Sequence, residues 1–135
     1  MKQTNLFLLL MLALVVSFSS CKDEPFATVT ITPLGSTADG DLNGDGGTAS
    51  KIYTWNNPQN IANYDMDITA SSGGTFQLIV KDADGMQVLN ETLVANQAPD
   101  SKSGLTLEGA IGDWTIEVYV TNFKGDGSFN LTPGT

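Results

Sequence analysis

Residues 114–121, WTIEVYVT, alternate strictly between apolar and polar side chains. The apolar set is Trp114, Ile116, Val118 and Val120, and the polar set is Thr115, Glu117, Tyr119 and Thr121. Successive side chains of a β-strand point to opposite faces, so this period of two predicts a strand with one face in a core and the other towards water. The same period recurs along the chain, and no window after residue 21 has the spacing of an amphipathic helix. The domain is therefore predicted to be all-β.

The alternating runs and the turn residues between them predict about eight antiparallel strands. They cover residues 27–33, 51–55, 61–70, 75–81, 86–94, 104–108, 113–121 and 127–132. The segment Asp82-Ala83-Asp84-Gly85 joins two of these runs and is typical of a hairpin turn. Short strands at this spacing predict a single domain over residues 27–135, built as a two-sheet sandwich or a barrel.

The stretch LEGAIGDWTIEVYVTNFKGDGSFNL, residues 107–131, combines a glycine, an aromatic strand, a glycine-rich turn and a last alternating strand. It resembles the closing strands of bacterial pre-peptidase C-terminal domains and of proprotein-convertase P-domains. The resemblance implies a jelly-roll-like β-sandwich. It implies little about function, because sandwiches carry many different activities.

The first twenty residues have the pattern of a secretory signal peptide. A short segment with one lysine, Met1 to Asn5, precedes an uninterrupted apolar run from Leu6 to Val16, and small residues follow from Ser17 to Ser20. The apolar run is shorter than the roughly 20 residues that a membrane-spanning helix needs. The alternative is a short buried helix at the start of the domain.

Cys21, the only cysteine of the chain, directly follows this segment. The arrangement resembles the signal of bacterial lipoproteins, in which the cysteine becomes the first mature residue and its sulfur receives a diacylglyceryl group. Phe18 departs from the family pattern, since an aliphatic residue is more usual three positions before the cysteine. The resemblance implies a lipid anchor at Cys21, with palmitate-type chains; the alternative is an ordinary secreted protein.

The residues after the cysteine bear on the location of the protein. Lys22, Asp23 and Glu24 resemble the export tag of surface lipoproteins in Bacteroidetes-type bacteria, which implies an outer-membrane lipoprotein that faces the medium. A plain solvated tether over residues 21–26, on a lipoprotein that faces the periplasm, is the alternative. Either reading places the folded domain close to a membrane.

Composition excludes several classes of function. Cleavage before Cys21 leaves five lysines, no arginine and fifteen carboxylates, so the net charge of the mature chain is −10. A chain of this charge repels phosphate backbones, which argues against nucleic-acid binding. A single cysteine permits no internal disulfide, so the domain is held by packing alone.

The sequence offers no convincing catalytic group. Histidine is absent, which removes His-based triads and His-ligated zinc. Asp65 and Asp67 lie two residues apart on one face of a predicted strand, but that face is its solvent side. The chain is therefore predicted not to be an enzyme.

A candidate metal site lies in DGDLNGDGG, residues 39–47. Asp41, Asn43 and Asp45, followed by Gly46, match the first half of a calcium loop, in which alternate side-chain oxygens converge on one ion. The twelfth position of that frame is Ile52, so the closing acid is missing. The alternative is an acidic loop between two strands, rich in Asp, Asn and Gly because turns favour them.

Tyr53 and Trp55 share one face of a predicted strand and could stack on sugar rings if they are exposed. Packing inside the sandwich is the alternative for this pair.

Taken together, the signal segment, the alternating strands and the missing catalytic groups lead us to expect a non-enzymatic, lipid-anchored β-sandwich lipoprotein with a binding or structural role. A calcium-assisted glycan-binding module, and an adhesion or envelope-assembly component that binds another outer-membrane protein, are the two alternatives.

Overall fold

A computed structural model describes residues 22–70 and 72–135 of the chain. The predicted signal peptide and Cys21 lie outside these described residues. In the described part the chain forms seven strands and no helix, and hence no helix that could span a membrane. The strands are β1 (Ala27–Leu34), β2 (Thr37–Asn57), β3 (Ala62–Ala70), β4 (Thr75–Lys81), β5 (Gln87–Val94), β6 (Ser101–Leu105) and β7 (Gly112–Pro133). The all-β prediction is confirmed.

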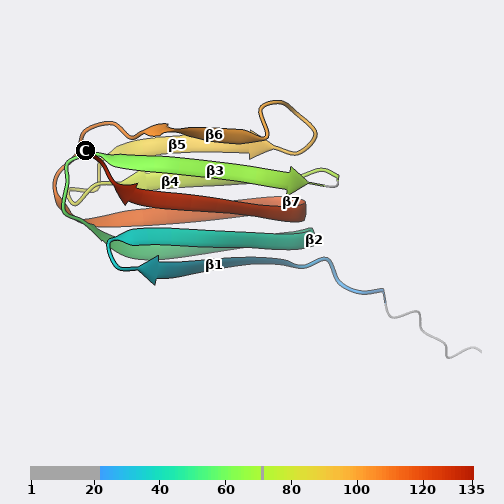
Figure 1. Cartoon of the computed structure of the whole chain (residues 1–135). Helices are drawn as coiled ribbons and strands as arrows, with labels where there is room; N and C mark the ends of the chain where they lie inside the picture. The colour runs from blue at the N-terminus through green and yellow to red at the C-terminus, as the bar shows by residue number, and fades with distance from the viewer. Residues whose placement is uncertain (1–21, 71) are drawn as a thin grey trace, which may run out of the picture.

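All the strand pairs are antiparallel, and two long strands take part in both layers of the sandwich (Figure 1). The first layer, sheet A, has the order β1, first half of β2, second half of β7, β3, β6. The second layer, sheet B, has the order second half of β2, first half of β7, β4, β5. Each half of β7 is therefore an inner strand of one of the two sheets.

The two long strands bend together where they pass from one sheet to the other. The pairing of β2 with β7 shifts register on both sides of Gly47, and Gly46 has a φ of 88°. On β7 the bend contains Asn122 at φ 48° and Gly125 at φ 142°. These left-handed conformations favour glycine and asparagine, which explains the residue types found there.

The core is formed by the inward side chains of both sheets. Trp114 is fully buried, as its phase in the alternating run predicts, and its ring meets that of Trp55 edge-to-face at a centroid distance of 6.0 Å. The other large buried side chains include Phe76, Phe123, Met66, Leu78, Leu93, Ile116 and Leu131. A contiguous apolar core of this kind can hold a domain of about this size without a disulfide.

The prediction of a loop over residues 39–47 is wrong, because this segment is the first half of β2. Its glycines fit close contacts instead of turns. A Cβ at Gly40 would lie 1.9 Å from the ring of Phe129 on the neighbouring strand, and one at Gly47 would lie 2.2 Å from the backbone of Phe26. The predicted strands 113–121 and 127–132 are likewise one bent strand, β7.

The turns collect at the two ends of the sandwich (Figure 1). The tether pole is the end where the chain enters the domain; it comprises Phe26, the bends 46–48 and 122–125, the turn 72–74 and the loop 95–100. The far pole carries the C-terminus and the connections 35–36, 58–61, 82–86 and 106–111. This polarity decides which residues lie near the predicted anchor.

Candidate functional site

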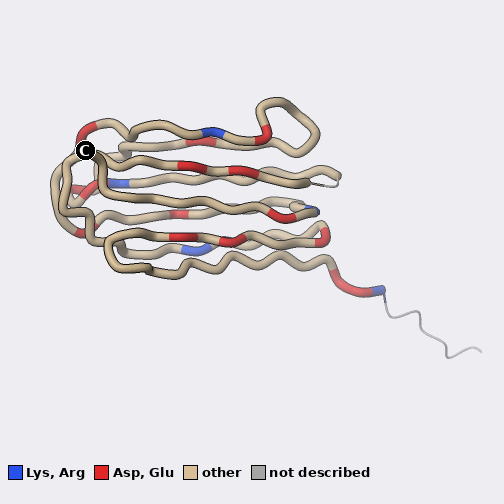
Figure 2. The backbone as a smooth tube through the Cα atoms, viewed as in Figure 1, with Lys and Arg blue, Asp and Glu red and all other residues tan. Residues whose placement is uncertain are grey.

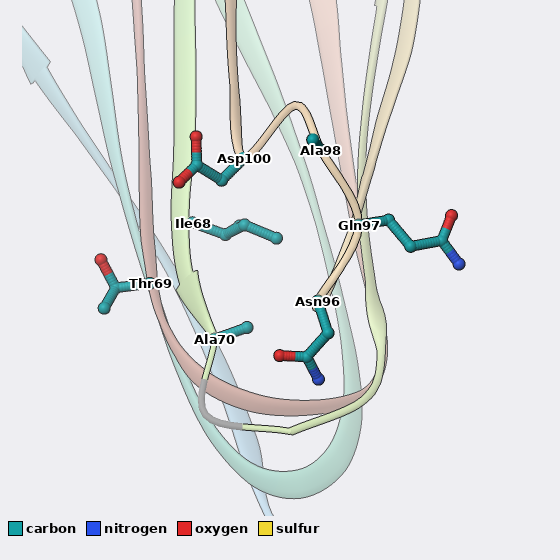
Figure 3. Close-up of a pocket in the computed structure, with 7 residues that line it drawn as sticks. All are labelled: Ile68, Thr69, Ala70, Asn96, Gln97, Ala98 and Asp100. Atoms are coloured by element: carbon teal, nitrogen blue, oxygen red, sulfur yellow. The ribbon is translucent and has the colours of Figure 1, made fainter.

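A hollow of about 400 Å³ lies at the tether pole between the end of β3 and the loop that joins β5 to β6. We call it the amide hollow; its lining is Ile68, Thr69, Ala70, Asn96, Gln97, Ala98 and Asp100. Figure 3 shows the side chains of Ile68 and Ala70 between strand and loop, and that of Asn96 pointing towards Ala70. Gln97 projects outward at the rim. The hollow thus joins an apolar floor to polar walls.

The loop that forms one wall is held to the rest of the sandwich by its backbone. The N–H of Ile68 donates to the carbonyl of Asp100 at 2.9 Å, and the N–H of Ala95 donates to the carbonyl of Gly74 at 3.0 Å. Ala95 is buried, whereas Asn96 takes a φ of 60°, a conformation that asparagine tolerates better than most residues. These contacts fix the loop at the edge of the hollow, with Asn96 pointing towards Ala70 and Gln97 outward.

The polar groups of the amide hollow are open to a ligand. Among the described residues, no hydrogen bond engages the side chains of Asn96, Gln97 or Asp100. No lysine lines the hollow, so its only formal charge is the carboxylate of Asp100. Amide and carboxylate groups beside an apolar floor suit an uncharged ligand with hydroxyl groups, which both donate and accept hydrogen bonds.

A second hollow, of about 510 Å³, lies on the other side of the last residues of β3. We call it the phenylalanine hollow; its lining is Phe26, Asn43, Gly44, Asp45, Thr69, Ala70, Lys124, Gly125 and Asp126. The ring of Phe26 is 52% exposed, and the ion pair between Lys124 and Asp45 measures 2.8 Å. Thr69 and Ala70 line both hollows, so the two sites lie side by side at the tether pole.

A smaller hollow of about 310 Å³ follows the open edge between β5 and β6. There Lys102 donates to Glu91 at 2.6 Å, which links the edge strands of the two sheets. Tyr64 lies beside this pair; burial, and after it the negative charge of Glu91, raises the pKa of Tyr64, while Lys102 opposes the rise. The groups of this edge are engaged with one another, so it is a weaker candidate for ligand binding.

The predicted calcium residues Asp41, Asn43 and Asp45 occupy alternate positions on the outer face of sheet A. They lie on an extended strand and do not converge in a loop. Asn43 donates to Asp126 on β7, and Asp45 pairs with Lys124. Within the described ranges, no group of three or more His, Cys, Asp or Glu side chains is arranged to hold a metal ion. Calcium binding stays a prediction.

The outer face of sheet A carries carboxylates in cross-strand rows separated by neutral donors. Figure 2 marks the acidic positions along β2 and β3. One row places Ser128 between Asp41 and Asp67, and the Ser128 hydroxyl donates to Asp67 at 2.6 Å. The next row places Asn130 between Asp39 and Asp65, and the Asn130 amide donates to Asp39. The interposed donors reduce the repulsion between carboxylates. Asp65 and Asp67 thus lie on the solvent side, as predicted.

The predicted stacking pair is not a surface platform. Trp55 is only 3% exposed, and its indole N–H donates to the carbonyl of Ser36 at 3.1 Å. Tyr53 is half-buried and packs against the core. Their strand pairs with β7 so that Tyr53 lies beside Ile116 and Trp55 beside Trp114, both on the inner face. Packing inside the sandwich, the alternative reading of this pair, is what the structure has.

Asp82 is the most strongly engaged carboxylate of the domain, and its role is structural. One oxygen accepts the N–H groups of Asp84 and Met86, and the other accepts the N–H of Ala110 at 2.8 Å. The Ala110 N–H above all, with those of Met86, Asp84 and Gly85, holds the Asp82 pKa below its ordinary value against the opposing effect of burial. Asp82 therefore joins the β4–β5 turn to the loop before β7.

Sequence reasoning missed the amide hollow. Its loop reads ANQAPD, residues 95–100, a polar run with a proline that is typical of any connection. The other wall, Ile68 to Ala70, ends a strand about thirty residues earlier, and only the pairing of β3 with β6 brings the two together. Two neighbouring carboxamides between predicted strands were the one signal of this site.

Comparisons with solved structures find chains similar to this one. No protein-family model matches the sequence, and no curated protein matches it. The chain is similar to TmCBM61, a carbohydrate-binding module whose structure was solved in complex with β-1,4-galactotriose. The match has 16% sequence identity and a TM-score of 0.46, and it covers 80% of this chain and 70% of that one. The function proposed below rests on the residues of this chain.

Proposed function

We propose that this chain is a non-catalytic, lipid-anchored lipoprotein of the outer membrane whose β-sandwich domain binds carbohydrate in the amide hollow. The observation that carries the proposal is the composition of that hollow. Asn96, Gln97 and Asp100 line the hollow with polar groups that no described residue engages, beside the apolar side chains of Ile68 and Ala70. Of these, Asn96 points towards Ala70 (Figure 3).

The chemistry of the hollow matches that of a sugar ring. A pyranose has hydroxyl groups around its edge and C–H groups on its faces, so it needs hydrogen-bond partners beside an apolar surface. The carboxylate of Asp100 can accept hydrogen bonds from hydroxyl groups, and the carboxamide of Asn96 can both donate and accept them. Because no lysine lines the hollow, a neutral sugar is favoured over a sulfated or phosphorylated one.

The anchor part of the proposal rests on the sequence. The apolar segment, the small residues and Cys21 support lipidation, and Lys22, Asp23 and Glu24 support export to the cell surface. Two or more acyl chains give stable membrane attachment without a spanning helix. Calcium assistance of binding is not part of this proposal.

The direct test is calorimetric binding of the soluble domain, residues 22–135, to a panel of neutral and acidic polysaccharides. We expect binding to one or more neutral polysaccharides and none to polyanions. The variant Asp100→Asn removes the charged acceptor with little change of shape, and we expect it to weaken binding by about tenfold or more, since hydrogen bonds to charged groups contribute roughly 1.5–3 kcal/mol.

A matched pair of variants separates the hollow from its surroundings. Asn96→Gly removes the carboxamide but keeps the left-handed backbone at low cost. Asn122→Gly makes the same change at the other described asparagine with positive φ, which lies at the same pole and lines neither hollow. We expect weaker binding with Asn96→Gly and unchanged binding with Asn122→Gly. Equal effects, or no binding to any neutral polysaccharide, would refute the site.

A second candidate function is docking on another outer-membrane protein through the far pole. Five large apolar side chains are exposed at or beside it: Leu34 at 59%, Met86 at 65%, Leu105 at 56%, Leu107 at 70% and Ile111 at 61%. Large apolar side chains exposed at one end of a domain are typical of interaction surfaces. Co-purification from detergent, with wild type compared with Leu107→Ser, tests this candidate: a partner lost with the variant supports docking.

A further inference from the structure

The amide hollow lies at the same end of the domain as the predicted anchor. The loop 95–100, the end of β3 and Phe26 all belong to the tether pole, and the C-terminus lies at the opposite end (Figure 1). The backbone carbonyl of Phe26 accepts the N–H groups of Asp45 at 2.9 Å and of Gly47 at 3.0 Å. These hydrogen bonds fix the chain to the domain from Phe26 onward, directly beside the phenylalanine hollow.

The short tether limits how the domain can sit on a membrane. Lys22 to Phe26 are exposed residues without strand or helix, and five residues span at most about 17 Å. The nine residues of β3 alone span about 30 Å along the sandwich. A lipid on Cys21 can therefore not be reached with the far pole on the membrane and the tether pole away from it. The tether pole stays near the surface in every permitted orientation.

Charge narrows what the tether pole can bind at that surface. Asp45, Asp100 and Asp126 line the two hollows, with Lys124 as the one lysine among the lining residues of both. In the tether Asp23 and Glu24 add two carboxylates against one lysine, Lys22, so the balance stays negative. Phosphate groups of lipids meet net repulsion here, whereas the neutral sugars of a glycolipid do not.

From these constraints we infer that the amide hollow takes a neutral sugar of a glycolipid in the membrane to which the protein itself is anchored. This inference rests on the proposed function, including the lipid at Cys21. Ligand and protein then meet on one surface, so a short tether suffices, and a glycan on another particle lies out of reach. A soluble polysaccharide lying against the membrane offers the same chemistry and is the alternative source of sugar.

Orientation is tested first, without any ligand. The lipidated full chain is placed in vesicles that carry a fluorescent acceptor on the lipid headgroups, with a donor dye on Gln97→Cys at the tether pole or on Asp84→Cys at the far pole. Wild type, whose Cys21 is acylated, takes no dye. We expect clearly stronger energy transfer from position 97 than from position 84. Equal transfer, or stronger transfer from position 84, would overturn the inference.

Binding on one membrane is tested with a neutral glycolipid, a diglycosyl diacylglycerol, as the probe. It is supplied in the same vesicles as the lipidated protein, in separate vesicles, or as its free oligosaccharide after delipidation. The readout is protection of the amides of residues 96–98 and 100 from hydrogen exchange. We expect protection in the same-vesicle and free-sugar arms, and none with separate vesicles. A flexible insert of about 30 Gly and Ser residues between Glu24 and Pro25 should restore protection there, because it extends the reach.

The outcomes separate this inference from the function beneath it. Protection by separate vesicles without the insert would contradict binding on the same membrane while leaving carbohydrate binding intact. Protection in the free-sugar arm alone would show that the pole does not engage glycolipid and would assign the site to soluble glycans. No protection in any arm would overturn the glycolipid inference, while the polysaccharide panel decides separately whether the hollow binds sugar at all.

Discussion

Lys102 on β6 and Glu91 on β5 join the two sheets across the open edge of the sandwich, at 2.6 Å between Nζ and Oε2. Both side chains are 31% exposed, so water screens the pair in part. Partly exposed ion pairs contribute roughly 0.2–1 kcal/mol to stability. The pair therefore contributes little to the stability of this edge.

The edge pair gives a prediction about both stability and tyrosine ionisation. We expect Lys102→Met to lower the free energy of unfolding by no more than about 1 kcal/mol, measured in urea. The same change should raise the Tyr64 pKa further, since it removes the positive charge that opposes the rise, and Glu91→Gln should lower that pKa. Ultraviolet titration, with Tyr64→Phe to assign the signal, measures both shifts. Shifts of the same sign would contradict the geometry.

Asp82 predicts how stability depends on pH. Its folded pKa is lowered by the N–H groups of Ala110, Met86, Asp84 and Gly85, so its carboxylate stabilises the fold fully above the ordinary aspartate pKa near 4. This contribution is lost as the pH falls through the lower, folded value. We expect Asp82→Asn to lower the melting temperature by on the order of 10 °C at pH 7 and to flatten its acid dependence.

The control for Asp82 is a second carboxylate with a lowered pKa. Glu117 accepts a hydrogen bond from Lys81, and this contact lowers its pKa. Glu117 lies on the outer face of sheet B, where water can replace a lost partner. Glu117→Gln should therefore change the melting temperature much less than Asp82→Asn. A larger effect of Glu117→Gln would mean that the Asp82 contacts are not the main acid-sensitive element.

We expect Trp55→Ala to lower the stability of the domain and not to impair carbohydrate binding selectively. Its ring is buried against Trp114, so Trp55→Ala leaves a cavity and should cost about 3–5 kcal/mol of unfolding free energy. Trp55→Phe retains most of the ring packing and should bind carbohydrate as wild type does. A Trp55→Ala domain that melts normally but fails to bind sugar would restore the stacking hypothesis.

The predicted lipid attachment at Cys21 can be tested by labelling. We expect wild type expressed in a bacterial host to incorporate radiolabelled palmitate and to fractionate with the outer membrane. Cys21→Ala should take up no label, because the acceptor sulfur is missing. Intact mass of the purified protein provides an independent measure. Absence of label in wild type would remove the anchor, and the glycolipid inference with it.

Calcium can be tested against simple screening of charge. An ion held by Asp41, Asn43 and Asp45 must displace the contacts of Asn43 with Asp126 and of Asp45 with Lys124. We therefore expect millimolar Ca²⁺ to raise the melting temperature no more than Mg²⁺, or NaCl at equal ionic strength, does. A rise in micromolar Ca²⁺ that Asp41→Asn abolishes would establish the tight site that the sequence motif predicts.

The sequence predicted those parts of the fold in which the period of two is uninterrupted. Trp114 to Thr121 and the hairpin around Asp82 to Gly85 fall in this class, because alternation and turn chemistry are local properties. Residues 39–47 could not be read correctly, since Gly40 is glycine to make room for Phe129, a residue about ninety positions away. A glycine required by a distant contact looks in the sequence like a glycine required by a turn.

The candidate site was beyond prediction for the same reason. Asn96 and Asp100 are polar loop residues in any reading, and their importance comes from Ile68 and Ala70 across the hollow. The pairing of β3 with β6, and of both with the rest of sheet A, sets that distance. The calcium motif misleads in the opposite way. Its residues match the pattern of a calcium loop, but they lie on a strand, where alternate side chains share a face and do not converge.

The passage of β2 and β7 through both layers also decides when this protein can fold. β7 is the last of the described strands along the chain, and it supplies the neighbours of β2, β3 and β4. Before β7 is in place, neither layer has its inner strand, and only local hairpins such as β1–β2 and β4–β5 can form. Both layers therefore complete their hydrogen bonding in one step, when β7 docks, and we expect the domain to fold without a populated state in which one layer is formed alone.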